Sequence, residues 1–571
     1  MQAFLRRSVL AIIIAALSNV ASARAGAAPV PAPAAAKHEA VSVRLPSEAF
    51  AALETISPEH IRWHVRYLSH DLLEGRGTGQ RGGDIAAEYI ATQFAEYGLK
   101  PAGENGSFMQ KVPLVGITTM PQTRFVLLPK QGASMDLKPL DEYVAYDQTQ
   151  QQQSDVDAEI VYLGYGIEAP EYNWDDYKGV DVRGKVLLML VNEPPSDDPK
   201  FFKGKALTYY GRWTYKFEEA ARKGAAGVIL IHREDMASYP WEVVRNSNSG
   251  EKSYLKLEGP ALKVASWVQF DVAKKLVAGS SLDLDKLIES ARSHDFHPVG
   301  LGARLRTHMV SNVRNFESNN VLASLPGSNR NLKDQAVMYT AHYDHLGIRP
   351  DMPGDNIYNG AADNATGCGI LLELARAFSV AKGHPGRSII FAAVTAEEQG
   401  LLGSEYLGKH PPIPAGKIAL DLNYDDIKPL GAPEEVEVTG AERTTFYPWV
   451  QATAKEFRLA IRPDARPEAG HFYRSDHFSL ARVGIPSFSI NEGMKFKGHD
   501  EAWGLAQDKE YTEKHYHQPS DEYHPEMDFT GDSAMARFGF ALGWEAASFS
   551  KLIGWQKGDE FEPARVKSQS Q

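Results

Sequence analysis

The sequence predicts an α/β fold: a mostly parallel sheet with helices on both faces, interrupted by an inserted smaller α/β domain. From Asn320 onward, apolar runs of strand length alternate with helical segments, which is the pattern of βαβ units. Residues 140–304 carry a second set of strand-like runs and helical segments, which indicates a separate inserted domain. The length of 571 residues exceeds one ordinary core and favours two or three domains.

Residues 1–23 are predicted to be a secretory signal peptide. Arg6 and Arg7 form its charged start, and the apolar core that follows is too short to span a bilayer comfortably. Ala21-Ser22-Ala23 is a cleavage signature, and Ala23-Arg24-Ala25 is its rival. We therefore expect an exported protein, periplasmic or secreted, with no membrane span after signal cleavage.

The rest of the chain divides by composition and periodicity. A Pro/Ala-rich linker follows the signal, helical patterns from Ser57 to Tyr97 open a main domain, and the end of the chain is polar and expected to be loose. The predicted segments are the linker 24–45, the N-terminal part of the main domain 46–139, the insert 140–304, the rest of the main domain 305–555 and the tail 556–571. In the main domain, strands are predicted at 336–341, 388–394, 418–422 and 485–490, and a last helix at 531–552.

Composition excludes some classes of function. The apolar fraction of 43% and the charged fraction of 23% are ordinary for a globular protein. A formal net charge of −12 argues against nucleic acid as a partner, because that would favour a basic face. The single cysteine, Cys368, cannot form an internal disulfide, and its apolar neighbourhood indicates a small buried residue rather than a nucleophile.

Polar side chains gather where the predicted strands of the main domain end. The carboxyl ends of such strands are the edge at which ligands bind in open α/β sheets. Each of these residues alone could simply be a polar loop residue or a helix cap. Together, however, they place possible metal ligands at the same edge of the sheet, one strand end after another. The strand ends and their loops supply His342, Asp363, Glu397, Glu398 and Asp425, and a late loop supplies His517.

Two histidines, several carboxylates and no cysteine suit a pair of divalent metal ions. Nitrogen and oxygen donors favour zinc, with manganese or cobalt possible. A carboxylate such as Asp363 can bridge two ions about 3.5–4 Å apart. Such a pair lowers the pKa of a bound water, and a nearby carboxylate that binds no metal can take its proton.

The motifs around these residues resemble the secreted co-catalytic di-zinc aminopeptidases. The superfamily of that family also holds glutamate carboxypeptidases, glutaminyl cyclases and the transferrin receptor. Residues 140–304 are similar to its protease-associated (PA) domain, with Gly166-Ile167 and Lys223 to Gly227 as landmarks. The matching motifs are His342-Tyr343-Asp344, Asn359 to Gly367, Glu397 to Ser404, Asn423-Tyr424-Asp425, Ser475 to Phe478 with Gly484-Ile485-Pro486, and Tyr516 to Asp521.

The resemblance implies a role for each site residue. His342 and Asp425 would bind one Zn²⁺, Glu398 and His517 would bind the other, and Asp363 would bridge them. Glu397 would be the general base and later the proton donor. Asp344 would orient His342, and Tyr516 would donate to the oxyanion, with a packing aromatic as the alternative for Tyr516. Asp426, His345 and His515 are rival ligands that we rank below their neighbours.

The function expected from the resemblance is a metallo-aminopeptidase. It would hydrolyse N-terminal residues from peptides that have a free N-terminus, using a zinc-activated bridging water with Glu397 as general base. Phe472, Tyr473 and Arg474 are candidates for lining the side-chain pocket, or else for packing in their loop.

Two alternatives stay open. A di-zinc carboxypeptidase or dipeptidase acting on acidic peptides would need a basic cluster for the substrate carboxylate, and Arg462, Arg466 and Arg474 are scattered in sequence. A non-catalytic binding protein on the same scaffold is less expected, because every ligand position of the family is filled.

Overall fold

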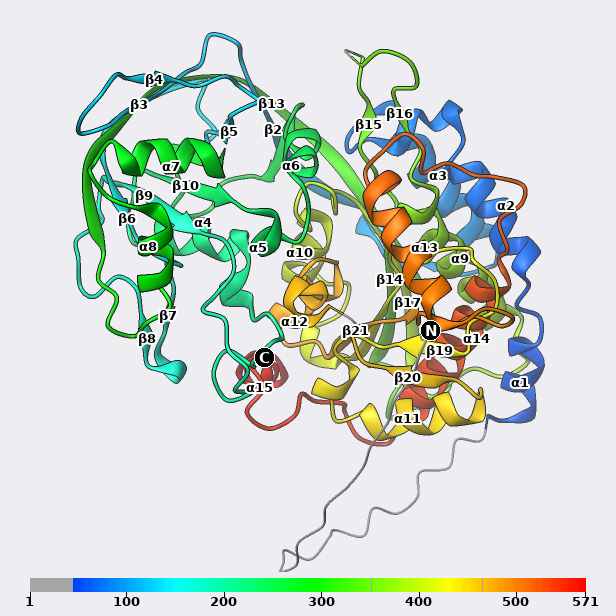
Figure 1. Ribbon diagram of the computed structural model, residues 1–571. Helices are drawn as coiled ribbons and strands as arrows, with labels where there is room; N and C mark the ends of the chain where they lie inside the picture. Colours follow the sequence, from blue (N-terminus) through cyan, green and yellow to red (C-terminus); the bar gives the residue numbers. More distant parts are fainter. Residues whose placement is uncertain (1–44, 351, 465, 571) are drawn as a thin grey trace, which may run out of the picture. The chain divides into compact units, whose positions relative to one another are not determined.

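The computed structural model describes residues 45–350, 352–464 and 466–570. Its main domain is built on a sheet whose strands are β13 Val299–Leu325, β14 Ala336–His342, β17 Ser388–Val394, β18 Ile418–Asn423 and β21 Ser487–Ser489. These strands lie in the order β21-β18-β14-β17-β13 (Figure 1). The first four run parallel, and β13 is antiparallel to β17. The predicted fold class, with a mostly parallel sheet, is therefore confirmed.

Helices cover both faces of this sheet, as predicted. Successive side chains of a strand point to opposite sides, so Val337 and Tyr339 of β14 face one hydrophobic cluster and Met338 faces another. Such double burial requires a continuous apolar run rather than an alternating one. The helices are α9 Thr366–Val380 and α14 Thr530–Ser548 in the first cluster, and α10 Leu402–Lys409 and α12 His477–Arg482 beside the second.

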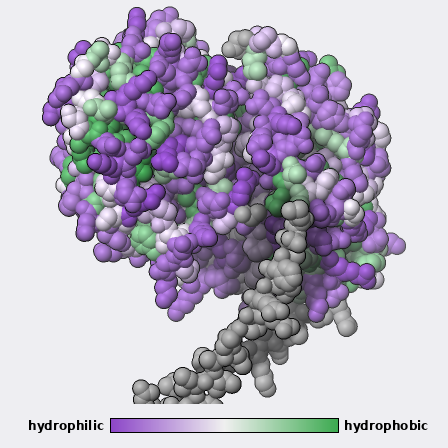
Figure 2. Space-filling model, in the orientation of Figure 1, coloured by the Kyte–Doolittle hydropathy of each residue, from purple (hydrophilic) through white to green (hydrophobic). Residues whose placement is uncertain are grey.

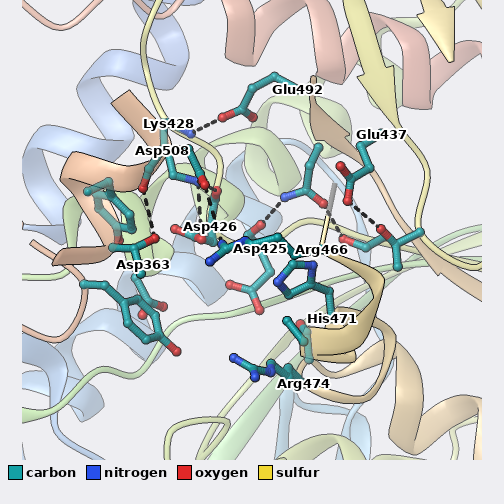
Figure 3. A pocket seen from close by; sticks show the side chains of 18 of the residues that line it. Asp363, Asp425, Asp426, Lys428, Glu437, Arg466, His471, Arg474, Glu492 and Asp508 are labelled. Carbon is teal, nitrogen blue, oxygen red and sulfur yellow. Dashed lines mark hydrogen bonds and ion pairs between the residues drawn. The ribbon is translucent and has the colours of Figure 1, made fainter. Parts of the chain in front are cut away.

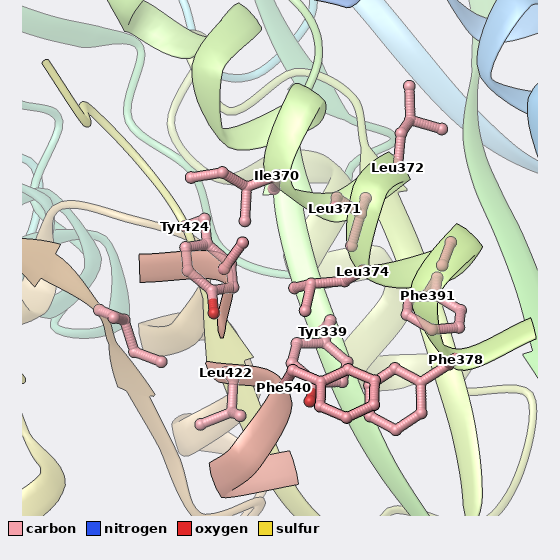
Figure 4. Close-up of a cluster of buried hydrophobic side chains, with 14 of the residues drawn as sticks. Tyr339, Ile370, Leu371, Leu372, Leu374, Phe378, Phe391, Leu422, Tyr424 and Phe540 are labelled. Carbon is pink, nitrogen blue, oxygen red and sulfur yellow. The ribbon is translucent and has the colours of Figure 1, made fainter. Parts of the chain in front are cut away.

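Aromatic side chains fill the space between the sheet and the first pair of helices (Figure 4). Tyr339 of β14 stacks on Phe391 of β17 with ring centroids 5.6 Å apart, and Phe378 of α9 lies 4.2 Å from Phe540 of α14. The buried Tyr339 hydroxyl donates a hydrogen bond of 2.9 Å to the carbonyl of Gly539, so its polar end is satisfied. This packing fixes the strands whose ends carry the candidate site residues.

The predicted insert contains a sheet with its own hydrophobic core. Strand β13 continues into this sheet and pairs with β6, and the predicted boundary at residue 304 lies inside β13. The parallel strands are β6 Gln153–Tyr162, β9 Val186–Leu190, β10 Gly227–His232 and β12 Val264–Gln269, with β5 Tyr143–Tyr146 antiparallel at the end. Its helices are α4 Trp213–Arg222, α5 Glu234–Ala237, α6 Trp241–Ser247, α7 Phe270–Ala278 and α8 Leu284–Ser290.

The remaining elements complete the description of the chain. The other helices are α1 Ser47–Leu53, α2 Pro58–Leu68, α3 Arg81–Glu96, α11 Tyr447–Glu456, α13 Glu501–Lys514 and α15 Glu562–Gln569. The other strands are β1 Lys100–Pro101, β2 Met109–Thr119, β3 Arg124–Leu128, β4 Met135–Asp136, β7 Glu168–Ala169, β8 Trp174–Asp175, β11 Lys252–Leu255, β15 Gly347–Ile348, β16 Ile357–Tyr358, β19 Glu435–Glu437, β20 Ala460–Arg462 and β22 Asn491–Glu492.

The prediction of a loose tail is wrong for most of its length. Helix α15 lies within the tail, and its Arg565 is buried. The Arg565 guanidinium donates hydrogen bonds to the carbonyls of Ile553 and Ile418, at 2.9 Å each. Ile418 is the first residue of β18, so these bonds attach the helix to the start of a core strand. The prediction was based on the polar composition of the tail. It failed because the single buried side chain of Arg565 is enough to attach this polar helix to the core.

The predicted signal peptide, and the linker up to residue 44, lie outside the described residues. Among the residues that the structure describes, no helix is both long and apolar enough to cross a membrane. Hydrophilic residues make up most of the molecular face drawn in Figure 2.

Candidate metal centre

The candidate ligands meet at the carboxyl edge of the parallel strands. His342 is the last residue of β14, and Asp425 follows the end of β18 by two residues. Glu397 and Glu398 stand in the turn after β17, where Ala396 has a φ of +56°. Because the three strands are parallel neighbours, their ends bring these side chains to one place.

One group of ligand atoms surrounds the outer ring nitrogen of His342. Nε2 of His342 lies 3.1 Å from Oδ1 of Asp425 and 3.2 Å from Oδ1 of Asp363. On the other side of the ring, Nδ1 lies 3.1 Å from the backbone carbonyl of Asp344. With Nδ1 occupied by that carbonyl, Nε2 is the ring nitrogen that is available to a metal.

A second group lies around the carboxylate of Glu398. Nε2 of His517 lies 3.1 Å from Oε2 of Glu398 and 3.3 Å from Oδ2 of Asp363. Nδ1 of His345 lies 2.6 Å from Oε1 of Glu398. His345 was ranked below its neighbours from sequence, yet its ring nitrogen falls within 4.8 Å of ligand atoms of Asp363 and Glu398. The structure therefore brings two histidines, rather than one, to the second group.

Asp363 belongs to both groups, with one carboxylate oxygen toward each. Its backbone is held by Asp521, whose two carboxylate oxygens accept hydrogen bonds from the N–H groups of Ala362 (3.0 Å) and Asp363 (3.1 Å). No role for Asp521 was predicted from the sequence, although this residue ends the motif that contains His517. Its position in that motif was the only feature of the sequence that could have indicated a role. The contact between Asp521 and the backbone of Asp363 joins residues more than 150 positions apart, so spacing along the sequence does not predict it.

These residues fit two bound cations. Buried carboxylates need paired charge, and here they face imidazole nitrogens at lengths of 3.1–3.3 Å. Burial raises the pKa of Glu398, but the neighbouring His517 and His345 more than offset this and lower it to about 2. Oxygen and imidazole donors without thiolate are typical of zinc and related divalent metals.

Glu397 lies beside the ligands without joining either group. Its Oε2 is 4.0 Å from Nε2 of His342. Burial raises the pKa of Glu397 well above its ordinary value, and the charges of Asp425 and Glu398 add to this, although His342 lowers it. A carboxylate with a raised pKa can accept a proton and later release it near neutral pH.

Asp344 was expected to orient His342 through its carboxylate, but the carboxylate makes other contacts. Its Oδ1 lies 3.9 Å from Nδ1 of His342, whereas it accepts a hydrogen bond of 3.1 Å from the backbone N–H of Glu397. Its Oδ2 accepts a hydrogen bond of 2.8 Å from the hydroxyl of Thr78. Asp344 thus supports His342 with its backbone and Glu397 with its side chain.

The other expected residues lie at varying distances from the centre. Tyr516 stacks on His517, with ring centroids 4.1 Å apart, and its hydroxyl makes no hydrogen bond to a described residue. His515 points away and contacts Ser520. Asp426 pairs with Lys428 at 3.4 Å.

A cavity of about 210 Å³ opens at the centre and is drawn in Figure 3. Glu397, Asp425 and His517 line its inner end. Its outer wall carries five further carboxylates and three cationic side chains. These are Asp426, Glu437, Asp464, Glu492 and Asp508, with Lys428, Arg466 and Arg474.

The positive charges of this cavity are largely neutralised. Lys428 lies 3.4 Å from Asp426 and 3.7 Å from Asp508, which also pairs with Arg466 at 3.5 Å. Glu437 and Glu492 form no ion pair with a described residue. Carboxylates therefore outnumber cations in this cavity, although Arg474 also lines it without an ion pair to a described residue, and burial raises the pKa of Glu437 to about 7.

Comparison with known proteins agrees with this geometry. The profile of Peptidase family M28 matches residues 320–538. A probable zinc metalloprotease of Pyrenophora teres f. teres is 38% identical over 106 residues, which are 18% of this chain and 22% of that protein. A BOS complex subunit, ncln, of Danio rerio is 27% identical over 190 residues, which are 31% of each protein. The chain thus spans about a fifth to a third of these relatives' length.

Among solved structures, the aminopeptidase from Aneurinibacillus sp. strain AM-1 is similar in fold. The TM-score is 0.52 with 18% sequence identity, over 88% of this chain and 97% of that one. At this identity the likeness concerns the fold alone. The profile match and the fold agree: residues 320–538, which lie within the main domain, are similar to peptidase family M28.

Proposed function

We propose that the chain is an exported zinc-dependent aminopeptidase that removes N-terminal residues from peptides. The observation that carries the proposal is the pair of ligand groups that share Asp363, with Glu397 held beside them. The similar proteins, a probable zinc metalloprotease and an aminopeptidase, support the same activity.

Each residue has a defined task in this proposal. His342 and Asp425 would hold one zinc ion, Glu398 and His517 the other, and Asp363 would contact both. When bound, the ions would supply a hydroxide equivalent at neutral pH and polarise the scissile carbonyl. Glu397 takes the proton from the attacking water and delivers it to the leaving amine.

The charge of the first cavity favours an amino terminus over a carboxyl terminus. Glu437 and Glu492 line it and have no cationic partner within 4.0 Å among the described residues. A protonated α-amino group would offset this negative charge, whereas a substrate carboxylate would be repelled. The substrate's first residue would therefore occupy this cavity.

The test combines metal content with hydrolysis. We expect close to two zinc ions per chain, turnover of amino-acid p-nitroanilides, loss of activity on chelation and recovery with zinc. A peptide with a blocked N-terminus should resist hydrolysis. Cleavage of blocked peptides would favour a carboxypeptidase, and full metal loading without hydrolysis of either type would overturn the proposal. N-terminal sequencing of the mature protein tests export.

A further inference from the structure

A second cavity, of about 480 Å³, meets the first one at the candidate metal centre. Glu397, Tyr516 and His517 line both. The second cavity extends toward the 140–304 insert, which contributes aromatic and apolar side chains such as Trp213 and Trp267. The candidate metal centre is thus open to two cavities, and the general base Glu397 lines both.

Two arginines in the wall of the second cavity have no carboxylate partner among the residues that the structure describes. Arg212 comes from the insert and Arg474 from the main domain. Neither forms an ion pair with a described residue, and the Nε of each is buried without a hydrogen-bond partner. The Arg474 guanidinium donates one long hydrogen bond, of 3.4 Å, to the carbonyl of Ala237, and the Arg212 guanidinium donates none to any described residue.

The two guanidinium groups lie close enough to repel each other. Burial lowers the pKa of Arg212 to about 10, and the positive charge of Arg474 contributes to the shift. At neutral pH both side chains still carry their charge. Like charges held together away from water are costly unless an anion joins them.

Two further cationic side chains line the second cavity, one without an ion pair and one with a carboxylate partner. Lys252, on β11, lines the cavity and forms no ion pair with a described residue. Arg482 also lines it, but its guanidinium lies 3.3 Å from the carboxylate of Glu218. The cavity therefore contains one compensated arginine and three cations that form no ion pair with a described residue.

We propose that Arg212 and Arg474, assisted by Lys252, bind a substrate carboxylate on the leaving side of the scissile bond. The preferred substrates are then short peptides whose terminal carboxylate reaches these residues, or peptides with an acidic second residue. This inference rests on the proposed aminopeptidase function and names the substrate class of the same centre.

The opposite charges of the two cavities give the substrate its direction. The amino group enters the first cavity, which carries unpaired Glu437 and Glu492. The carboxylate enters the second, which carries Arg212 and Lys252, and Arg474 lines both cavities where they meet. A short peptide has the same separation of charge along its length, so it binds with its first peptide bond at Glu397. The arginines are scattered in the sequence and did not reveal a basic cluster. The fold assembles one from Arg212 and Lys252 of the insert and Arg474 of the main domain.

The experiment compares matched substrates on the zinc-loaded full chain. Leu-Ala is compared with Leu-Ala-amide, and Leu-Asp-amide with Leu-Asn-amide, by kcat/KM. A charge-assisted contact to arginine predicts at least about a tenfold preference for the charged member of one pair. Preference in the first pair identifies a terminal carboxylate, and preference in the second identifies an acidic side chain.

Variants test whether the arginines cause the preference. Arg212→Gln and Arg474→Gln should each bring the charged-to-uncharged ratio toward one, and Arg212→Lys should retain part of it. Arg482→Gln is the matched control, because Arg482 is already paired, and its ratio should equal that of the wild type. Equal rates within both pairs, or ratios unchanged in both arginine variants, would overturn the inference while leaving the aminopeptidase proposal intact. Absence of all peptide hydrolysis would instead reject both.

Discussion

The backbone N–H of Glu397 donates a hydrogen bond of 3.1 Å to the carboxylate of Asp344. Asp344 is fully buried, and its second oxygen is occupied by Thr78. The carboxylate therefore fixes the turn that carries the general base. We predict that Asp344→Ala lowers kcat by about 10–100-fold, the usual effect of losing such a supporting group, because it leaves the Glu397 N–H unpaired.

Asp344→Asn is the matched comparison. The amide oxygen can still accept from Glu397, and the amide nitrogen can donate to the hydroxyl of Thr78. Its kcat should stay within a few-fold of the wild type, measured at saturating zinc with metal content determined alongside. Equal losses in both variants would mean that the negative charge of Asp344, rather than its hydrogen bonds, is what the centre requires.

Glu397→Gln tests the proton transfer directly. The amide retains the size of the side chain but cannot accept a proton, so kcat should fall by about 10²–10⁴-fold. Zinc content should be unchanged, since Glu397 lies outside both ligand groups. The measurement is single-substrate kinetics with metal analysis of the same sample. Near-native turnover with zinc bound would exclude Glu397 as the base.

His345 and His517 approach the two oxygens of Glu398 from different directions. His517 also faces Asp363 at 3.3 Å, whereas His345 is 4.0 Å from it. We predict that His517→Ala loses one zinc ion per chain. His345→Ala should retain both ions with affinity weakened by about 10–100-fold, as for a residue that supports a ligand.

Metal titration with a competing chelator measures both variants. A His345→Ala chain that holds only one ion would instead make His345 a direct ligand. Comparison with His515→Ala provides the control, because His515 contacts Ser520 outside the centre and its loss should leave stoichiometry and affinity unchanged.

The strands that position the centre could be predicted, because a strand buried on both faces has a recognisable sequence pattern. The segments β14 and β17 are continuous apolar runs that end in polar residues, and parallel neighbours place those ends at one edge. His342, Glu398 and Asp425 follow from that rule. His517 does not: it lies in a loop after α13, where no periodicity sets the direction of a side chain.

Contacts between distant segments could not be predicted from the sequence either, because periodicity does not determine where a loop side chain points. The partners of Glu398 include His345, whose orientation depends on loop backbone angles rather than on strand alternation. Arg212 reaches the centre from the insert, more than 180 residues before Glu397. Arg565 turns a polar tail into a docked helix through one buried side chain. Each of these depends on tertiary packing, which composition and spacing do not encode.

Buried His64 gives the fold a pH dependence that is separate from the centre. Its Nδ1 lies 2.9 Å from the hydroxyl of Tyr89, and burial lowers its pKa to about 4. An unfolded histidine has a pKa of about 6.5. Between these values the unfolded chain binds a proton that the folded chain does not, so the free energy of unfolding decreases as the pH falls through 6.5.

We expect this one group to cost about 3 kcal/mol of stability by pH 4, compared with pH 8. His64→Gln keeps a polar group for Tyr89 but cannot titrate, so the free energy of unfolding should depend less steeply on pH between 6.5 and 4. Urea unfolding across that range measures the difference from the wild type. His410→Gln, at an exposed position, is the control and should keep the wild-type slope. Parallel curves for the wild type and His64→Gln would show that His64 carries a proton in the folded chain at these pH values.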